Sequence, residues 1–124
     1  MSEVTISVPV DLLSKLLRAL QTGGDLFSVW QVLDRLQDGR AQLWREGESL
    51  IVTELYNSPA GRTVHFWLAA GDLREVLKLS RQVLEWSKAN GCVRALAFGR
   101  KGWARALRAD GWKASERVLL QREV

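Results

Sequence analysis

Apolar residues in the first forty positions recur every three or four residues, which is the spacing of one helix face. The recurrence predicts a helix over residues 10–21, ended by Gly23-Gly24. A second helix is predicted as far as Gly39, with Asp25 as its N-terminal cap. Before both helices, the alternation from Thr5 to Val8 predicts a short strand. The two apolar faces comprise Leu13, Leu16, Leu17 and Leu20, and then Leu26, Val29, Trp30, Leu33 and Leu36.

From residue 41 the apolar pattern changes to the period of a strand. Three strands are predicted at 41–45, 49–56 and 62–69, and turn residues at 46–48 and 57–61 separate them. Such short turns between successive strands favour an antiparallel meander. In the third strand, Val64, Phe66 and Leu68 are predicted to share one face, because alternate residues of a strand point the same way.

The rest of the chain alternates between helix and strand. A long helix is predicted over 73–89, a strand over 93–98, a short helix over 103–109 and a final strand over 114–121. The full order, β-α-α-β-β-β-α-β-α-β, describes one α/β (α+β) domain over residues 1–124. Because strand, helix and strand follow one another between residues 63 and 98, the mixed sheet must hold at least one parallel pair. The buried stripe of the long helix comprises Leu73, Val76, Leu77, Ser80, Val83, Leu84 and Ser87.

The junction between the third strand and the long helix is a candidate anion site. The first amides and the dipole of a helix favour a bound phosphate. Here Asp72 is predicted to cap the helix with its own carboxylate, and Glu75 is predicted to complete a capping box. The Asp72 carboxylate therefore competes for the amides that a phosphate would use.

Positive charge is concentrated near the C-terminal end of the sequence. Residues 94–124 hold eight basic and three acidic residues, whereas the whole chain has a net charge of +4. Lys101, Arg105 and Arg108 share a helix face, which is either a binding surface for an anionic partner or a solvated face. Nucleic acid is disfavoured as that partner, because the face lacks interleaved aromatic residues and a groove-reading motif.

The cysteine content and the absence of a predicted membrane span or signal peptide indicate where the protein is located. Cys92 is the only cysteine, which excludes an internal disulfide and favours a reducing compartment. No membrane span and no signal peptide are predicted, so the expected location is cytoplasmic.

On the long helix, Trp86, Leu79 and Val83 form a second stripe beside the main one, and a protein partner is expected there unless another element covers it.

The order of elements resembles the GNAT-type N-acetyltransferase fold. Residues 86–96, followed by 105–112, are similar to the helix, strand, short helix and Gly-aromatic tail of that fold. Residues 39–44, 52–54 and 99–103 are similar to small GNAT-like proteins encoded by tailed bacteriophages. The resemblance implies that acetyl-CoA would be the donor of an active enzyme, with Arg100 or Lys101 at its phosphates and Glu54 as the base. The other implied cofactor-binding residues are Leu68, Ala69, Ala70, Gly71, Asp72 and Leu73.

Three positions depart from the family pattern. The strand-to-helix junction has one glycine and Asp72, where the family carries Q/R-x-x-G-x-G/A. Leu107 stands where the family often has a tyrosine as general acid, and Arg100 stands near a common asparagine. These departures favour a catalytically degenerate protein that serves as a virion-associated assembly or interaction module, with other phage proteins or a second copy as partners. The alternative is an acetyl-CoA-dependent N-acetyltransferase.

Glu54 and His65 are the candidate bases. Glu54 shares a strand face with Tyr56, and the competing interpretation is a solvated or salt-bridged residue on a polar face. His65 faces away from Val64 and Phe66, and the competing interpretation is a packed or surface histidine. As the only histidine, His65 has no second ligand at metal-binding spacing, so no metal site is predicted.

Overall fold

The computed structural model describes residues 10–22, 28–97, 101–115, 120 and 122–123. The described elements are α1 (Val10–Thr22), α2 (Val29–Gln37), β1 (Ala41–Glu46), β2 (Ser49–Ser58), β3 (Gly61–Ala70), α3 (Leu73–Ala89), β4 (Cys92–Ala97) and α4 (Lys101–Arg108). Their order and types agree with the eight central elements predicted from the sequence. The strand predicted at residues 5–8 lies outside the described residues.

The four described strands form one mixed sheet in the order β1-β2-β3-β4. The first three strands pair antiparallel, as the short turns between them predicted. β4 pairs parallel with β3 after the chain has crossed over through α3. Both the meander and the parallel pair are therefore confirmed.

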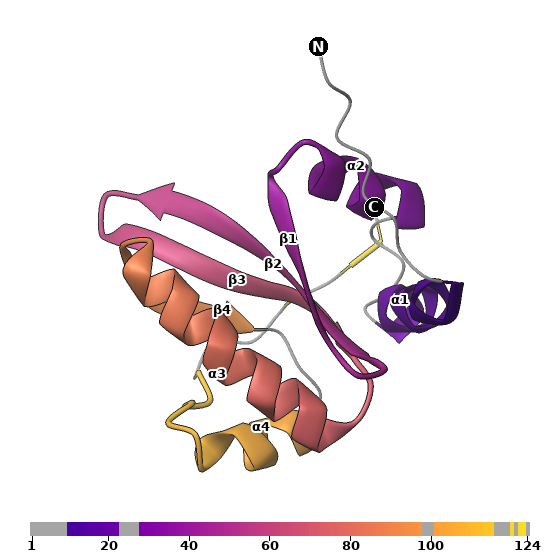
Figure 1. Cartoon of the computed structure of the whole chain (residues 1–124). Helices are drawn as coiled ribbons and strands as arrows, with labels where there is room; N and C mark the ends of the chain where they lie inside the picture. The colour runs from indigo at the N-terminus through magenta and orange to yellow at the C-terminus, as the bar shows by residue number, and fades with distance from the viewer. Residues whose placement is uncertain (1–9, 23–27, 98–100, 116–119, 121, 124) are drawn as a thin grey trace.

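Helices cover both faces of this sheet (Figure 1). α1 and α2 lie on one face and α3 and α4 on the other, so the domain has two apolar cores. The core on the α1–α2 side contains Leu16, Leu20, Val32, Leu36, Ala41, Leu50, Val52 and Leu68. The core on the α3 side contains Ile51, Val64, Phe66, Val76, Leu79 and Val83.

A β-bulge in β3 changes which residues share a face. Val52 pairs with Leu68 and Thr53 pairs with Phe66, so Trp67 is the extra residue of β3. As a result Leu68 packs into the α1–α2 core, whereas Phe66 packs into the α3 core. The prediction that Leu68 shares a face with Val64 and Phe66 is therefore wrong, because one extra residue interrupts the alternation.

The start of α2 also differs from the prediction. Ser28 is the N-cap, and its side chain and that of Gln31 form a reciprocal capping box. Asp25 lies outside the described residues, and its predicted role as the cap of this helix is wrong because the helix begins at Val29. Trp30, predicted on the apolar face, has 72% of its surface exposed.

The second stripe of α3 is covered by the sheet. Leu79 is 1% exposed and Val83 is fully buried, and both belong to the α3 core. The ring of Trp86 packs edge-on against Trp44 of β1 with 5.2 Å between ring centroids. The prediction of an exposed partner-binding stripe containing Leu79 is therefore wrong, because α3 lies across β1 and β2 and buries Leu79 and Val83. Leu73, predicted in the buried stripe, is 43% exposed at the start of the helix.

The described residues after β4 contain one helix and no strand. Residues 112–115 have no regular structure, so the predicted final strand does not begin at residue 114, and residues 116–119 and 121 lie outside the described part. Trp103 and Trp112 pack against the α3 core instead. No helix in the described residues is long and apolar enough to cross a bilayer.

Candidate functional site

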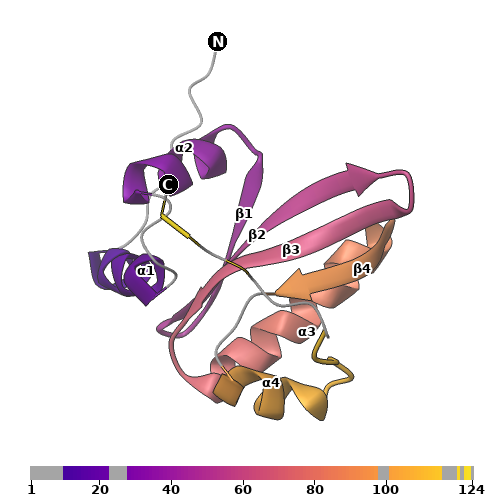
Figure 2. The ribbon, with the colours of Figure 1, turned by 180° about the vertical axis from the view of Figure 1, so that it is seen from behind.

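β4, at the edge of the sheet, ends before β3 does. Their pairing runs from Arg62 opposite Cys92 to Phe66 opposite Ala97, where β4 ends. β3 continues to Ala70, so its last four residues have no β4 residue beside them (Figure 2).

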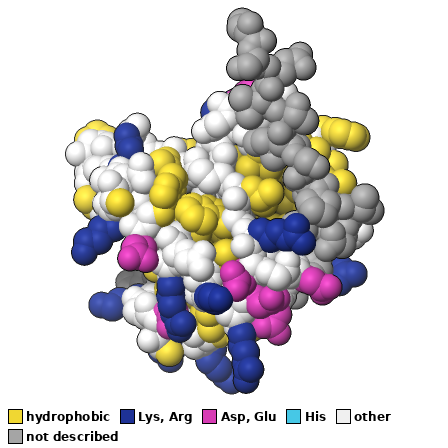
Figure 3. Space-filling model, viewed as in Figure 1, with side chains coloured by type: hydrophobic (Ala, Val, Ile, Leu, Met, Phe, Trp, Pro, Cys, Tyr) yellow, Lys and Arg dark blue, Asp and Glu magenta, His cyan; other side chains and the backbone are white. Residues whose placement is uncertain are grey.

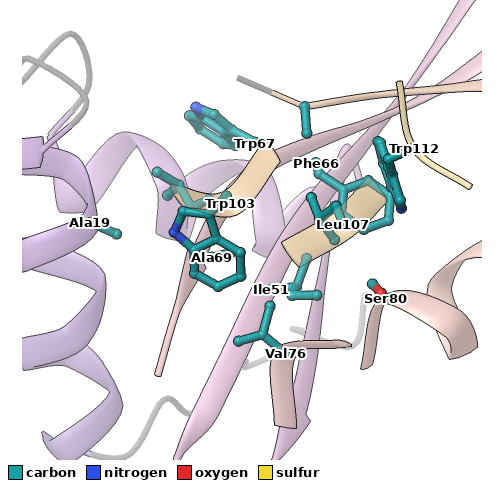
Figure 4. Close-up of a pocket in the computed structure, with 12 residues that line it drawn as sticks. Ala19, Ile51, Phe66, Trp67, Ala69, Val76, Ser80, Trp103, Leu107 and Trp112 are labelled. Carbon is teal, nitrogen blue, oxygen red and sulfur yellow. The ribbon is translucent and has the colours of Figure 1, made fainter. Parts of the chain in front are cut away.

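A pocket of about 150 Å³ lies beside this last part of β3 (Figure 4). Its walls come from β3, the end of β4, α3 and α4, and most of its lining is apolar or aromatic. Ser80 contributes a hydroxyl, which already donates to the carbonyl of Leu77. Such a pocket suits a small apolar group, for example the acyl group of a thioester. The lining residues are Ala19, Ile51, Phe66, Trp67, Leu68, Ala69, Val76, Ser80, Ala97, Trp103, Leu107 and Trp112.

The start of α3 carries the carboxylate cap that the sequence predicted. Asp72 accepts hydrogen bonds from the amides of Arg74 at 3.0 Å and Glu75 at 3.3 Å. The predicted capping box with Glu75 is wrong, because the Asp72 amide donates to the hydroxyl of Ser49 at 2.9 Å instead. Ser49 in turn donates to the Glu75 carboxylate at 2.8 Å. Ser49 therefore links β2 to the first turn of α3.

Gly71 is required by this packing. Its φ of +123° is a conformation that residues with a side chain rarely adopt. A Cβ on Gly71 would lie 2.6 Å from both Cα and Cβ of Ser49. Close contact with β2 thus explains the one glycine of the junction without any ligand.

The same contacts limit what the start of α3 can bind. The amides of residues 72, 74 and 75 already have acceptors inside the protein. A diphosphate would need such amides and would also face the negative charge of Asp72. Arg100, predicted at the cofactor phosphates, lies outside the described residues, and only the backbone of Lys101 is described.

Glu54 lies at the centre of a buried polar cluster on the α2 side of the sheet. The residue is 6% exposed. One carboxylate oxygen accepts from Arg35 Nη1 at 2.8 Å, and the other accepts from the Tyr56 hydroxyl at 2.9 Å. His65 Nδ1 lies 3.8 Å from the second oxygen. Glu54 is therefore ion-paired, as one interpretation of the sequence expected, but it is not on a solvated face.

Burial controls the proton affinity of the two rings beside Glu54. It lowers the pKa of His65 below the usual 6.5, although the Glu54 carboxylate acts in the opposite direction. His65 is therefore a neutral imidazole at pH 7. Burial, the hydrogen bond to Glu54 and its negative charge all raise the pKa of Tyr56.

Trp67 connects the polar cluster to the pocket. The Arg35 guanidinium lies 4.9 Å from the centroid of the Trp67 ring, and the same ring lines the pocket (Figure 4). No local pattern in the sequence indicates this contact, because Arg35 and Trp67 are far apart in the chain. Trp67 alternates with Phe66 and therefore lies on the α1–α2 side of the sheet.

α4 has one side in the pocket and another in solvent. Trp103 and Leu107 line the pocket, whereas Arg105 and Arg108 are exposed. Leu107 has no ionisable group, so it supplies no proton to a reaction there. In the described part of the chain, no group of three potential ligand side chains could hold a metal ion.

No family model matches the sequence, and no curated protein matches it. Solved structures match by fold. An acetyltransferase of Trypanosoma brucei superposes with a TM-score of 0.66 at 11% identity, covering 94% of this chain and 96% of that one. The chain has a GNAT-type acetyltransferase fold. The resemblance to this fold is thereby confirmed, and nothing in these matches links the chain to tailed bacteriophages.

Two other matches show how widely this fold is used. An aminoglycoside acetyltransferase from an uncultured soil metagenomic sample, solved in complex with sisomicin, has a TM-score of 0.62 at 14% identity and covers 90% of this chain and 87% of that one. A transcriptional regulator from Bacillus halodurans C-125 has a TM-score of 0.61 at 16% identity and covers 96% and 97%. At such identities the likeness concerns the fold, and function must be argued from the site.

Proposed function

We propose that this GNAT-fold protein transfers an acyl group from a thioester to an amine. The observation that carries the proposal is the position of the pocket. It lies beside the last part of β3, beyond the end of β4, and it shares Trp67 with the buried Arg35–Glu54 pair. The pocket for an apolar acyl group thus shares one wall residue, Trp67, with the cluster that contains Arg35, Glu54 and His65. The acetyltransferases among the similar structures support the same reaction class.

His65 is the group best suited to take the proton. An amine that enters as an ammonium ion must lose a proton before its nitrogen can attack. The buried imidazole of His65 is neutral at pH 7 because its pKa is lowered, so it can accept that proton. Glu54 already receives hydrogen bonds on both oxygens from Arg35 and Tyr56. We therefore assign Glu54 as the residue that positions His65, in place of the base expected from the sequence.

The donor implied by the fold is acetyl-CoA, and this site fits it only in part. The pocket is large enough for an acetyl group and the end of a pantetheine arm. A bound thioester would supply the activated acyl group. The capped start of α3 does not match the diphosphate, because Asp72 and Ser49 occupy its amides.

The test is an assay of thiol release from acetyl-CoA with a panel of primary amines. We expect amine-dependent release by the wild type, and a rate about one hundredfold lower in His65→Gln. Glu85→Gln, at an exposed position of α3, is the matched control and should keep the wild-type rate. Release that never exceeds the buffer rate with any amine would refute acyl transfer from acetyl-CoA.

The second candidate is a non-catalytic assembly module, including the virion-associated type that the phage resemblance implies. The observation in its favour is the filled anion site at Asp72, together with Leu107 at the expected general-acid position. Its partner surface would be the exposed Arg105 and Arg108 and the part of Trp86 that Trp44 leaves uncovered. A calorimetric titration that gives no heat with acetyl-CoA at millimolar concentration, at low and moderate salt, would favour this candidate.

A further inference from the structure

The acyl pocket and the start of α3 differ in how well they fit acetyl-CoA as the donor. The pocket, with its volume of about 150 Å³ and its mostly apolar lining, suits the acyl group of a thioester. At the start of α3, the amides of residues 72, 74 and 75 are already bonded internally, so a diphosphate that used them would have to displace these bonds. A donor that enters through the pocket therefore gains little from a nucleotide diphosphate. It would also meet repulsion from Asp72.

The surface of α4 beside the pocket carries exposed positive charge, which could bind an acidic partner. α4 contains no acidic residue, and its Arg105 and Arg108 are exposed. Neither side chain has an acidic partner among the described residues, whereas Arg81 on α3 is held by two bonds of 3.0 Å to Asp110. In Figure 3, Lys and Arg side chains lie among Asp and Glu side chains on the lower part of the molecule, where α3 and α4 lie in Figure 1.

We propose that the acyl donor is a pantetheine thioester carried by a small acidic protein, which docks on Arg105 and Arg108 and inserts its arm into the pocket between β3 and α4. This rests on the proposed acyl transfer and specifies the carrier. The two arginines lie on the same helix as Trp103 and Leu107, which line the pocket. A carrier bound to the outer side of α4 would thus have its arm near the pocket. Complementary charge would orient the encounter.

The experiment compares three acetyl thioesters by calorimetry at low and moderate salt. The probes are acetyl-CoA, acetyl-pantetheine without phosphate or nucleotide, and an acidic carrier protein loaded with acetyl-phosphopantetheine. We expect acetyl-CoA and acetyl-pantetheine to bind with Kd values within about threefold of each other, since only the shared arm is recognised. The loaded carrier should bind at least about tenfold more tightly at low salt and lose that advantage as salt rises.

Charge reversal separates docking from pocket binding. Arg105→Glu combined with Arg108→Glu should lower the affinity for the loaded carrier about tenfold and leave the Kd of acetyl-pantetheine unchanged. The control is Arg45→Glu combined with Lys88→Glu, which removes the same charge from exposed positions outside α4 and should leave both affinities near wild type. Circular dichroism of each double variant checks that it is folded.

The outcomes distinguish this inference from the proposed function. If acetyl-CoA binds ten times more tightly than acetyl-pantetheine, the nucleotide is recognised and the inference is wrong, while acyl transfer stands. If the loaded carrier binds no better than acetyl-pantetheine, or the charge reversal on α4 changes nothing, the carrier protein is not the donor. Binding of the acyl group in the pocket is then unaffected. If no thioester binds at millimolar concentration, the proposed function itself fails.

Discussion

At the scale of single residues, the cap of α3 shows what local sequence can and cannot reveal. Asp72 was predicted as the cap because its role depends on amides two and three residues away. The part played by Ser49 could not be predicted, because it arises only when β2 packs on α3. The capping box failed for the same reason, since Ser49 takes the position that Glu75 was expected to fill.

Two substitutions separate the capping role of Asp72 from the effect of its negative charge. Asp72→Ala removes the acceptor for both amides and should lower the free energy of unfolding by about 1 kcal/mol. Asp72→Asn keeps an acceptor without the charge and should unfold close to wild type in urea. Acetyl-CoA should bind Asp72→Asn at least as well as wild type, because repulsion of the diphosphate is gone. Equal stability of all three proteins would show that the cap contributes nothing.

Gly71 should tolerate substitution less than a glycine with open space around it. Gly71→Ala would place a Cβ against Ser49 at a φ of +123°, so we expect a loss of about 2 kcal/mol or more in the free energy of unfolding. Gly111 also has a positive φ, of +88°, but no atom lies within 4 Å of its Cβ position. Gly111→Ala should therefore cost only about 1 kcal/mol of backbone strain. Urea unfolding measures the free energy of unfolding of both variants. Equal losses would show that the contact with Ser49 adds nothing to the cost at Gly71.

His65 should make stability depend on pH. Its folded pKa lies below 6.5, so below about pH 6.5 the unfolded chain binds a proton that the folded protein does not. The stabilisation is complete above pH 6.5 and is lost as pH falls through the folded pKa. We therefore expect the free energy of unfolding to decrease between pH 7.5 and pH 5.5, and to decrease less in His65→Gln.

The same residue gives a direct spectroscopic test. Because His65 is the only histidine, its imidazole NMR signals need no assignment. Glu54 raises the pKa of His65, so Glu54→Gln should move the midpoint to lower pH. A midpoint that stays in place would mean that Glu54 does not act on His65, and its assignment as a positioning residue would fail.

At the scale of elements, the hydrophobic pattern predicted the types and order of the central elements, but not the faces of two of them. The width of the buried face of α3 could not be predicted from the sequence, because a helix that lies across a sheet buries more than one line of side chains. The face of Leu68 was missed because Phe66, Trp67 and Leu68 are all apolar, so the sequence does not mark the extra residue. Both errors concern how elements pack, which local periodicity does not encode.

The burial of α3 predicts different effects for two of its leucines. Leu79 is 1% exposed in the core, so Leu79→Ala should lower the free energy of unfolding by about 3 kcal/mol. Leu73, at the start of the same helix, is 43% exposed, and Leu73→Ala should cost under about 1 kcal/mol. Urea unfolding of both variants checks this. A small loss at Leu79 would restore the partner-binding stripe that the sequence suggested.

At the scale of the whole molecule, the fold gathers an apolar pocket, a neutral histidine and a basic helix around the second half of β3. The sequence located two of these features, but not the pocket, because residues from α1, β2, β3, α3, β4, α4 and Trp112 line it together. Only the assembled fold brings them into contact. This is why the sequence could indicate candidate residues for phosphate but not the space for the acyl group.

Occupation of the pocket should stabilise the whole domain. A ligand that binds only the folded protein adds about 2.7 kcal/mol at one hundred times its Kd, which for a chain of this size raises the Tm by roughly 10 °C. Ala69→Phe should abolish the shift by acetyl-pantetheine, because Ala69 lines the pocket and the larger ring would fill it. Ala104→Phe, at an exposed position of α4 outside the lining, should keep the shift. An equal shift in both variants would mean that the thioester binds elsewhere, since a filled pocket cannot also hold its acyl group.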